Sequence, residues 1–206
     1  EDMKYDELAD QIVHNLGSPD VIALQEVQDN DGAGKGADLS ADQNIQNLID
    51  AIYAESGLHY AYVEIAPTVA NSTGGEANGN IRNGYLYNVD RVDFVEGSLQ
   101  TISDASYSNS REPLVATWSF QGQQITTIDV HFYARSGGDP MWGANQPPEI
   151  SGDDRRTDQA AAMGNWINDH LADNPGLNIA VMGDWNGFYW EEAQTQLTDA
   201  GLVNLQ

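Results

Sequence analysis

Cysteine is absent from the 206-residue chain, so the chain has neither a disulfide nor a thiolate metal site. No apolar run approaches the roughly 18 residues that a membrane-spanning helix requires. Basic residues are scarce: eight Lys and Arg stand against 32 Asp and Glu, which gives a formal net charge of −24. The electrostatic field of this negative charge repels polyanions, so the composition disfavours non-specific nucleic-acid binding through a basic surface.

The rest of the composition is that of one folded domain spanning residues 1–206. Apolar residues make up 40% of the chain, which is typical of a globular protein. The length fits a single domain with a sizeable core. The acidity suits a salty or calcium-rich exterior, where counterions screen self-repulsion. An acidic surface that serves solubility is the favoured explanation of the charge; a secreted, salt-adapted protein is the functional expectation that it also suits.

Hydrophobic periodicity predicts helices and strands near both ends of the chain and a strand-rich centre. Helices are predicted over residues 4–16, 41–56, 153–176 and 191–201. Strands are predicted over residues 18–27, 60–65, 81–88, 92–97, 113–120, 124–132 and 177–183. Between the last two strands, residues 133–152 form a long aperiodic loop, a feature that is usually functional. This order indicates two packed sheets with helices outside, an α/β layered domain.

Two of the predicted buried strands end by presenting a carboxylate, Glu26 in "VIALQE" and Asp184 in "NIAVMGD". Strand ends are where a sheet places a ligand site. Hard cations such as Mg²⁺ take one or two carboxylates together with water and substrate phosphate. Asn186 lies two residues beyond Asp184 and adds a neutral amide for a water or a phosphoryl oxygen. A structural carboxylate at a strand end is the alternative, most of all for Glu26.

Of the four histidines, His131 has the least ordinary position, because it ends the apolar run "ITTIDVH" before the long loop. Imidazole titrates near physiological pH, so His131 is a candidate to hydrogen-bond or protonate a phosphate. A purely structural role is equally compatible with its position. The other three have ordinary positions: His14 within the first helix, His59 at a strand start and His170 near a helix end, where a cation suits the dipole.

Five of the six arginines flank strand ends or the long loop: Arg82, Arg111, Arg135, Arg155 and Arg156. Guanidinium groups suit bidentate phosphate recognition. Arg82 and Arg111 are candidates for phosphate contact or for structural pairing. For Arg155 and Arg156, in the first turn of a predicted helix, we favour structural pairing with the neighbouring aspartates.

Five motifs occur in order along the chain: "PDVIALQEV", "NIRNGYLYN", "SREPLVATW", "DVHF" and "VMGDWNGF". Together they resemble the endonuclease/exonuclease/phosphatase superfamily of DNase I-like and sphingomyelinase-like phosphodiesterases. The segment "SGGDPMWGANQPPEISGDDRRTDQA" is similar to an insertion in the extracellular bacterial nuclease branch. The resemblance covers essentially the whole chain. It implies a four-layer α-β-β-α sandwich with the active site at one end of the paired sheets.

The resemblance also implies roles for individual residues. Glu26 would be the metal ligand, Asp184 and Asn186 would position the attacking water and the transition-state oxygens, and His131 would contact the scissile phosphate. Arg82 and Arg111 would lie along the substrate groove. The implied reaction is in-line attack of water on a phosphodiester with Mg²⁺ as cofactor; Mn²⁺ or Ca²⁺ would also suit these carboxylates. For the aromatic residues of the last motif we favour packing over base stacking.

The chain departs from the family pattern at both ends and beside His131. It begins beyond the strand that carries the family's metal-orienting Asn, and it stops before the late strand that carries the Asp-His pair. We expect a longer chain, or else a partner chain, to supply these strands. Val130 stands where the related nucleases commonly have Asn, and "YARS" replaces the usual Ser-Lys, which leaves Arg135 as the candidate cation.

Two main functions remain open at this point, with a hydrolase of small phosphomonoesters as a weaker third. The first is a secreted, metal-dependent nuclease or other phosphodiesterase that acts on DNA, RNA or another phosphodiester as part of a longer chain. The second is a catalytically silent domain of a larger acidic surface or matrix protein. Both expect a DNase I-like fold, and the first requires Glu26, His131 and Asp184 to surround one cavity.

Overall fold

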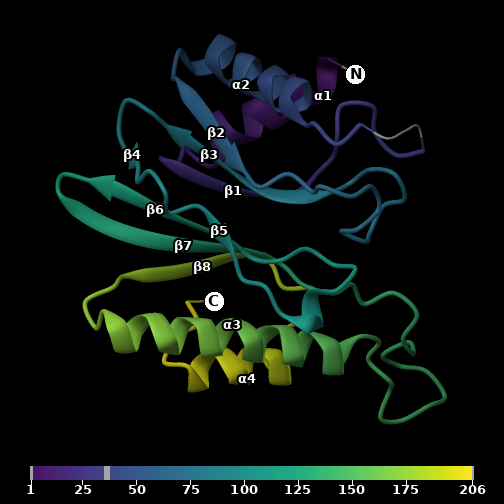
Figure 1. Cartoon of the computed structure of the whole chain (residues 1–206). Coiled ribbons are helices and arrows are strands. Elements are labelled where there is room, and N and C mark those ends of the chain that lie inside the picture. Colours follow the sequence, from purple (N-terminus) through teal and green to yellow (C-terminus); the bar gives the residue numbers. More distant parts are fainter. Residues whose placement is uncertain (1, 35–37, 206) are drawn as a thin grey trace.

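Two β-sheets pack face to face, and helices cover the outer face of each sheet (Figure 1). The computed structural model describes residues 2–34 and 38–205. Its four layers run from α1 and α2, through the two sheets, to α3 and α4 (Figure 1). This arrangement confirms the predicted α-β-β-α sandwich.

The first sheet has three antiparallel strands with β3 in the centre. In spatial order its strands are β1 (Val21–Val27), β3 (Arg82–Asn88) and β2 (Tyr60–Glu64). Its outer face is covered by α1 (Asp2–Asp10), the π-helical segment η1 (Gln11–Asn15) and α2 (Asp42–Ser56). In α2 the buried residues Ile45, Leu48 and Ile52 recur every three or four positions, so one apolar stripe faces the sheet.

The second sheet has five strands and contains both antiparallel and parallel pairs. Its strands are β4 (Asp93–Phe94), β5 (Gln100–Thr101), β6 (Leu114–Phe120), β7 (Gln123–His131) and β8 (Ile179–Asp184). A tight turn at Gln121 and Gly122, both with positive φ, joins β6 to antiparallel β7. The next strand, β8, runs parallel to β7. Parallel neighbours end at the same sheet edge, so β7 and β8 deliver their last residues to one place.

Helices α3 (Asp153–Asp173) and α4 (Glu192–Asp199) cover the outer face of the second sheet (Figure 1). The short 3₁₀-helix η2 (Ala105–Tyr107) precedes β6. Met163 and Ile167 of α3 pack with Ile128 and Val130 of β7, and all four are buried. Between the sheets, a separate cluster centred on fully buried Trp118 joins residues of both. The domain therefore has three apolar layers, one between each pair of structural layers.

The structure differs locally from the sequence predictions in the first helix and in the strand predicted over residues 92–97. The first predicted helix changes to π-helical geometry at residue 11. The strand predicted over residues 92–97 is shorter: Asp93 and Phe94 pair with β6, the Val95 amide donates to the Thr117 carbonyl at 2.9 Å, and a turn follows. Residues 133–152 contain turns and no helix or strand, as predicted. In the described ranges, no helix combines the length and apolarity needed to cross a membrane.

Candidate active site

The parallel pairing of β7 with β8 places His131 opposite Asp184 in register. The His131 Nε2 atom lies 3.8 Å from Asp184 Oδ2. The backbone ladder continues one step further, because the Phe132 amide donates to the Asp184 carbonyl at 2.9 Å. The two strand ends therefore bring an imidazole and a carboxylate to one sheet edge.

Gly183 allows the backbone of β8 to lie close to the backbone of β7. Its φ of +132° is disfavoured for residues with a side chain, and a Cβ at this position would lie 2.1 Å from the Val130 carbonyl oxygen. The glycine before Asp184 is thus required by the backbone of β7. This explains the Gly-Asp order at the end of β8.

Glu26 reaches the same place from the other sheet. It has a φ of +57°, and the pairing of β1 with β3 shifts register between Leu24 and Val27. Such a β-bulge re-aims a side chain at the end of a strand. The Glu26 Oε1 atom lies 3.8 Å from His131 Nε2, the same distance as Asp184 Oδ2, so two carboxylates lie near one ring nitrogen.

Asn186 is held in place by a tight turn after Asp184. Its φ is +46°, its backbone amide donates to Asp184 Oδ1 at 2.8 Å, and its Nδ2 donates to the Phe132 carbonyl at 2.9 Å. The turn fixes one carboxylate oxygen of Asp184 and leaves Oδ2 beside His131. Asp184 and Asn186 therefore form one rigid unit.

His131 is almost completely buried and uncharged at neutral pH. Burial lowers its pKa to about 4, and the positive charge of Arg111 acts in the same direction while Asp184 opposes it. Its Nδ1 atom has no hydrogen-bond partner among the described residues. A neutral imidazole near two carboxylates can donate one hydrogen bond and accept another.

Arg111 ties the backbone around the site together. Its guanidinium is buried and donates to the carbonyls of Thr73, His131 and Phe132 at 3.2 to 3.4 Å. Burial lowers the pKa of Arg111, while Glu26 and Asp184 raise it. The arginine therefore adds a fixed positive charge that is electrostatically coupled to both carboxylates.

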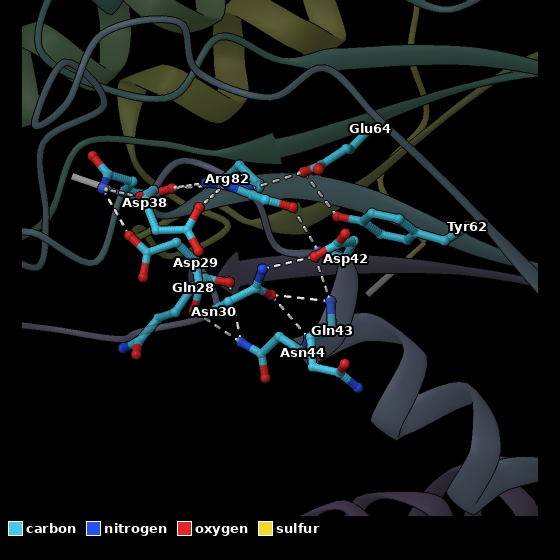
Figure 2. Close-up of polar contacts among 12 residues, drawn as sticks. Gln28, Asp29, Asn30, Asp38, Asp42, Gln43, Asn44, Tyr62, Glu64 and Arg82 are labelled. Carbon is cyan, nitrogen blue, oxygen red and sulfur yellow. Dashed lines mark hydrogen bonds and ion pairs between the residues drawn. The ribbon is translucent and has the colours of Figure 1, made fainter. Parts of the chain in front are cut away.

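Arg82 and Arg111, the two predicted phosphate contacts, line the same cleft of about 440 Å³. Arg82 is nevertheless held by internal partners. Its Nε and Nη2 donate to the Asn80 carbonyl, and its Nη1 lies 3.5 Å from Glu64 Oε2. Figure 2 shows this contact with Glu64, which also accepts from the hydroxyl of Tyr62. Glu26, His131 and Asp184 are not among the residues that line this cleft, so the contact of both arginines with a substrate phosphate stays a prediction.

A buried polar group beneath the site was missed by the sequence analysis. Asp129 is completely buried, its Oδ1 accepts from Gln25 Nε2 at 2.6 Å, and its carbonyl accepts from Asn83 Nδ2 at 3.0 Å. These contacts join β7 to the first sheet. The sequence does place an aspartate two positions before His131 inside an apolar run. Because side chains alternate between the two faces of a strand, this spacing puts both residues on one face.

The remaining arginines make internal contacts. Arg135 pairs with Glu191, Arg156 lies 3.6 Å from Asp153, and Arg155 donates to backbone carbonyls near η2. The expected pairing with a neighbouring aspartate is present for Arg156, whereas Arg155 is held by the backbone carbonyls of Ser106 and Ser108 instead. Among the aromatic residues, Trp185 packs edge-on against Phe132, as expected for a packing role. Tyr189 and Trp190, in contrast, are exposed.

The carboxylates of Glu26 and Asp184 fit a hard divalent cation. Their side chains are 68% and 51% exposed, and each has a carboxylate oxygen 3.8 Å from His131 Nε2. Both offer oxygen ligands, which Mg²⁺, Mn²⁺ and Ca²⁺ accept. The arrangement can bind a cation and a phosphate group side by side.

By sequence, no protein-family profile and no curated protein matches the chain. By structure, the chain is similar to TDP2 of D. rerio in a complex with a single-strand DNA product, with a TM-score of 0.52 and 17% identity over 98% of this chain and 60% of that one. The human Nocturnin catalytic domain gives a TM-score of 0.60 and 13% identity, over 93% and 60% of the two chains.

A third solved structure carries the family name. An endonuclease/exonuclease/phosphatase family protein from Bacteroides thetaiotaomicron gives a TM-score of 0.58 and 12% identity, over 97% of this chain and 60% of that one. The chain thus spans about 60% of the length of these three structures. These similarities confirm the predicted endonuclease/exonuclease/phosphatase fold, and the extracellular bacterial branch stays a prediction.

Proposed function

We propose that the chain is the catalytic domain of a divalent-metal-dependent phosphodiesterase. The observation that carries the proposal is the meeting of Glu26, His131 and Asp184, which come from β1, β7 and β8 in two different sheets. On this fold, the two carboxylates would supply metal ligands and the neutral imidazole a phosphate contact, and the remaining strands of the family would come from a longer chain or a partner chain.

Glu26 and Asp184 would hold the metal ion, with Mg²⁺ the expected ion and Mn²⁺ or Ca²⁺ as alternatives. When bound, such an ion neutralises charge that develops on the phosphate oxygens. The fit rests on exposed carboxylate oxygens at one edge of the fold.

The chain's own groups position the phosphate and the water. Neutral His131 donates from Nε2 to a non-bridging phosphate oxygen, and the fixed charge of Arg111 favours the anion nearby. Asp184 and Asn186, locked together by their turn, orient the attacking water. The water oxygen forms a bond to phosphorus as the opposite ester bond breaks; the proton of the water passes to the solvent, and the leaving alkoxide takes a proton from the solvent.

For the substrate we propose nucleic acid, DNA or RNA, acted on outside the cell. The fold it shares with TDP2, described in a complex with single-strand DNA product, supports a nucleic-acid substrate. The net charge of −24 supports a secreted, salt-adapted protein. The same charge favours weak, salt-screened encounter with the substrate over tight binding to duplex DNA.

The test is hydrolysis of bis(p-nitrophenyl) phosphate and of DNA and RNA by the complete protein that contains this domain. We expect turnover that a chelator abolishes, and a loss of about 100-fold or more in kcat for Asp184→Asn and Glu26→Gln. The exposed Asp173, at the end of α3, provides the matched control Asp173→Asn, which should retain full activity. No turnover by the complete protein would overturn the proposal and favour the catalytically silent domain.

A further inference from the structure

The first helix and α2 together form a second cluster of potential metal ligands, away from the candidate active site. Its α-helical part ends at Asp10, and η1 continues with π-helical geometry, in which the Leu16 amide donates to the Gln11 carbonyl at 3.0 Å. π-Helical turns inside helices often occur at functional sites. His14 lies within this turn, four residues after Asp10, and both face α2 of the same outer layer.

We propose that Asp10, His14 and Glu55 form a binding site for a divalent transition-metal ion, with Zn²⁺ as the expected occupant. His14 Nε2 lies 2.7 Å from Glu55 Oε1 and 4.0 Å from Asp10 Oδ1. In the part of the chain that the structure describes, this is the one group of three such side chains whose ligand atoms all lie within 4.8 Å of one another. The geometry, rather than any sequence motif, identifies the site.

The distances are close to those of an occupied site. Zinc bonds to imidazole nitrogen and carboxylate oxygen are about 2.0–2.2 Å long, so tetrahedral ligands lie about 3.3–3.6 Å apart. The contact with Glu55 must widen and the contact with Asp10 must shorten, each by less than about 1 Å. All three side chains are about half exposed, so rotamer changes can supply these shifts without moving the helices.

The ligand set selects a class of ion. Imidazole nitrogen favours Zn²⁺, Cu²⁺ and Ni²⁺ over Mg²⁺ and Ca²⁺, which prefer all-oxygen sites. Two carboxylates with a neutral imidazole carry a charge of −2, which a dication cancels, and the net charge of −24 favours that neutralisation. Water completes the coordination, because three protein ligands leave a fourth position open.

Binding would connect two helices that otherwise meet through apolar contacts. Ile12 of η1 packs in the same buried cluster as Leu48 and Ile52 of α2. Asp10 and His14 belong to the first helical segment, whereas Glu55 lies in the last turn of α2. An ion held by all three would clamp the N-terminal helix onto the domain, so it should stabilise the folded state.

The test is zinc binding by Glu26→Gln/Asp184→Asn protein, a background that removes the carboxylates of the candidate active site. We expect one Zn²⁺ per chain by calorimetry, and a rise in Tm of about 5 °C when zinc exceeds its Kd by about 100-fold. Co²⁺ should give the visible absorption of an imidazole-coordinated ion. In two-dimensional NMR, Ni²⁺ should broaden the ring signals of His14 before those of the other histidines.

The variants His14→Gln and Glu55→Gln separate the site from general acidity. Each should weaken zinc binding at least 10-fold and remove the Tm shift, while exposed positions let both variants fold as the wild type does. The matched control is His59→Gln: His59 also contacts a carboxylate, Asp90, at 2.8 Å, but has one such partner. Undiminished zinc binding in His14→Gln and Glu55→Gln, or equal loss in His59→Gln, would overturn the proposal. None of these readouts depends on hydrolase activity.

Discussion

His131 and Asp184 stand at the same level of two parallel strands, with Nε2 and Oδ2 3.8 Å apart. The two residues are far apart in sequence, because helix α3 lies between β7 and β8 in the chain. Their distance is therefore set by the register of β7 on β8. Any change that moves β8 along or away from β7 will alter the candidate active site before it disrupts the rest of the fold.

Gly183→Ala should be strongly destabilising. The new Cβ would lie 2.1 Å from the Val130 carbonyl oxygen, so β8 must move off β7 or the backbone must distort. We expect the free energy of unfolding to fall by about 3 kcal/mol or more, measured by urea denaturation. The control is Gly97→Ala, which has positive φ but no atom within 4 Å of the added Cβ; it should cost about 1–2 kcal/mol. An equal loss of unfolding free energy in Gly183→Ala and Gly97→Ala would show that the contact with Val130 is unimportant.

Asp129→Asn should change how stability depends on pH. Burial raises the pKa of Asp129 well above its usual value, so the folded state binds this proton more tightly than the unfolded state does. Its stabilising contribution is then complete below the unfolded pKa of about 4 and is lost as pH rises toward the folded pKa. Asparagine cannot ionise, so the stability of the variant relative to wild type should increase from pH 4 upward.

Urea titrations at several pH values measure this difference, with Asp173→Asn as an exposed control. Asparagine can keep the contact with Gln25 by accepting at its oxygen, as Oδ1 does now at 2.6 Å. A constant difference between Asp129→Asn and wild type from pH 4 to pH 8 would contradict the raised pKa.

Arg111→Met should raise the pKa of His131. Burial and the charge of Arg111 together lower this pKa to about 4, so removing the charge removes one of the two causes. Arg111→Lys keeps the charge and should hold the pKa near its wild-type value. The measurement is an NMR titration of the His131 ring without metal, and Arg91→Met, at an exposed arginine paired with Asp20, is the control. An unchanged pKa in Arg111→Met would refute the coupling.

Arg82→Met should destabilise the domain by about 3 kcal/mol or more, because it leaves Glu64 partly buried without its cation. Glu64→Gln in the same chain should restore part of that loss, which makes a double-mutant cycle the appropriate measurement. Arg82→Lys, which keeps the charge, provides the test of a phosphate contact. A raised KM at unchanged stability would assign Arg82 to the substrate as well as to the ion pair.

Several features could be predicted because they depend on local patterns. Alternating apolar residues located β6 and β7, and the three-to-four-residue spacing in α2 located the helix. The carboxylates at the ends of β1 and β8 were visible as polar residues that close an apolar run. The bulge that gives Glu26 its positive φ was not predictable, because it depends on pairing with a strand about 60 residues later.

His14 shows the limit of the sequence most clearly. Within its helix His14 has an ordinary position. Its contact with Glu55, which lies 41 residues later in the chain, depends on how α2 packs against the first helix. The same holds for Asp129, whose partners Gln25 and Asn83 belong to the other sheet. Contacts of this kind have no local signature.

The sequence by itself determined the elements, the layered class and the residue types that carry the chemistry, because hydrophobic period and turn residues act over a few positions. Tertiary structure alone decided which of those residues meet: Glu26 with His131 across two sheets, Arg82 with Glu64, and His14 with Asp10 and Glu55. The physical reason is that distances between side chains on different elements depend on register and packing, which are settled by the burial of the whole apolar surface at once.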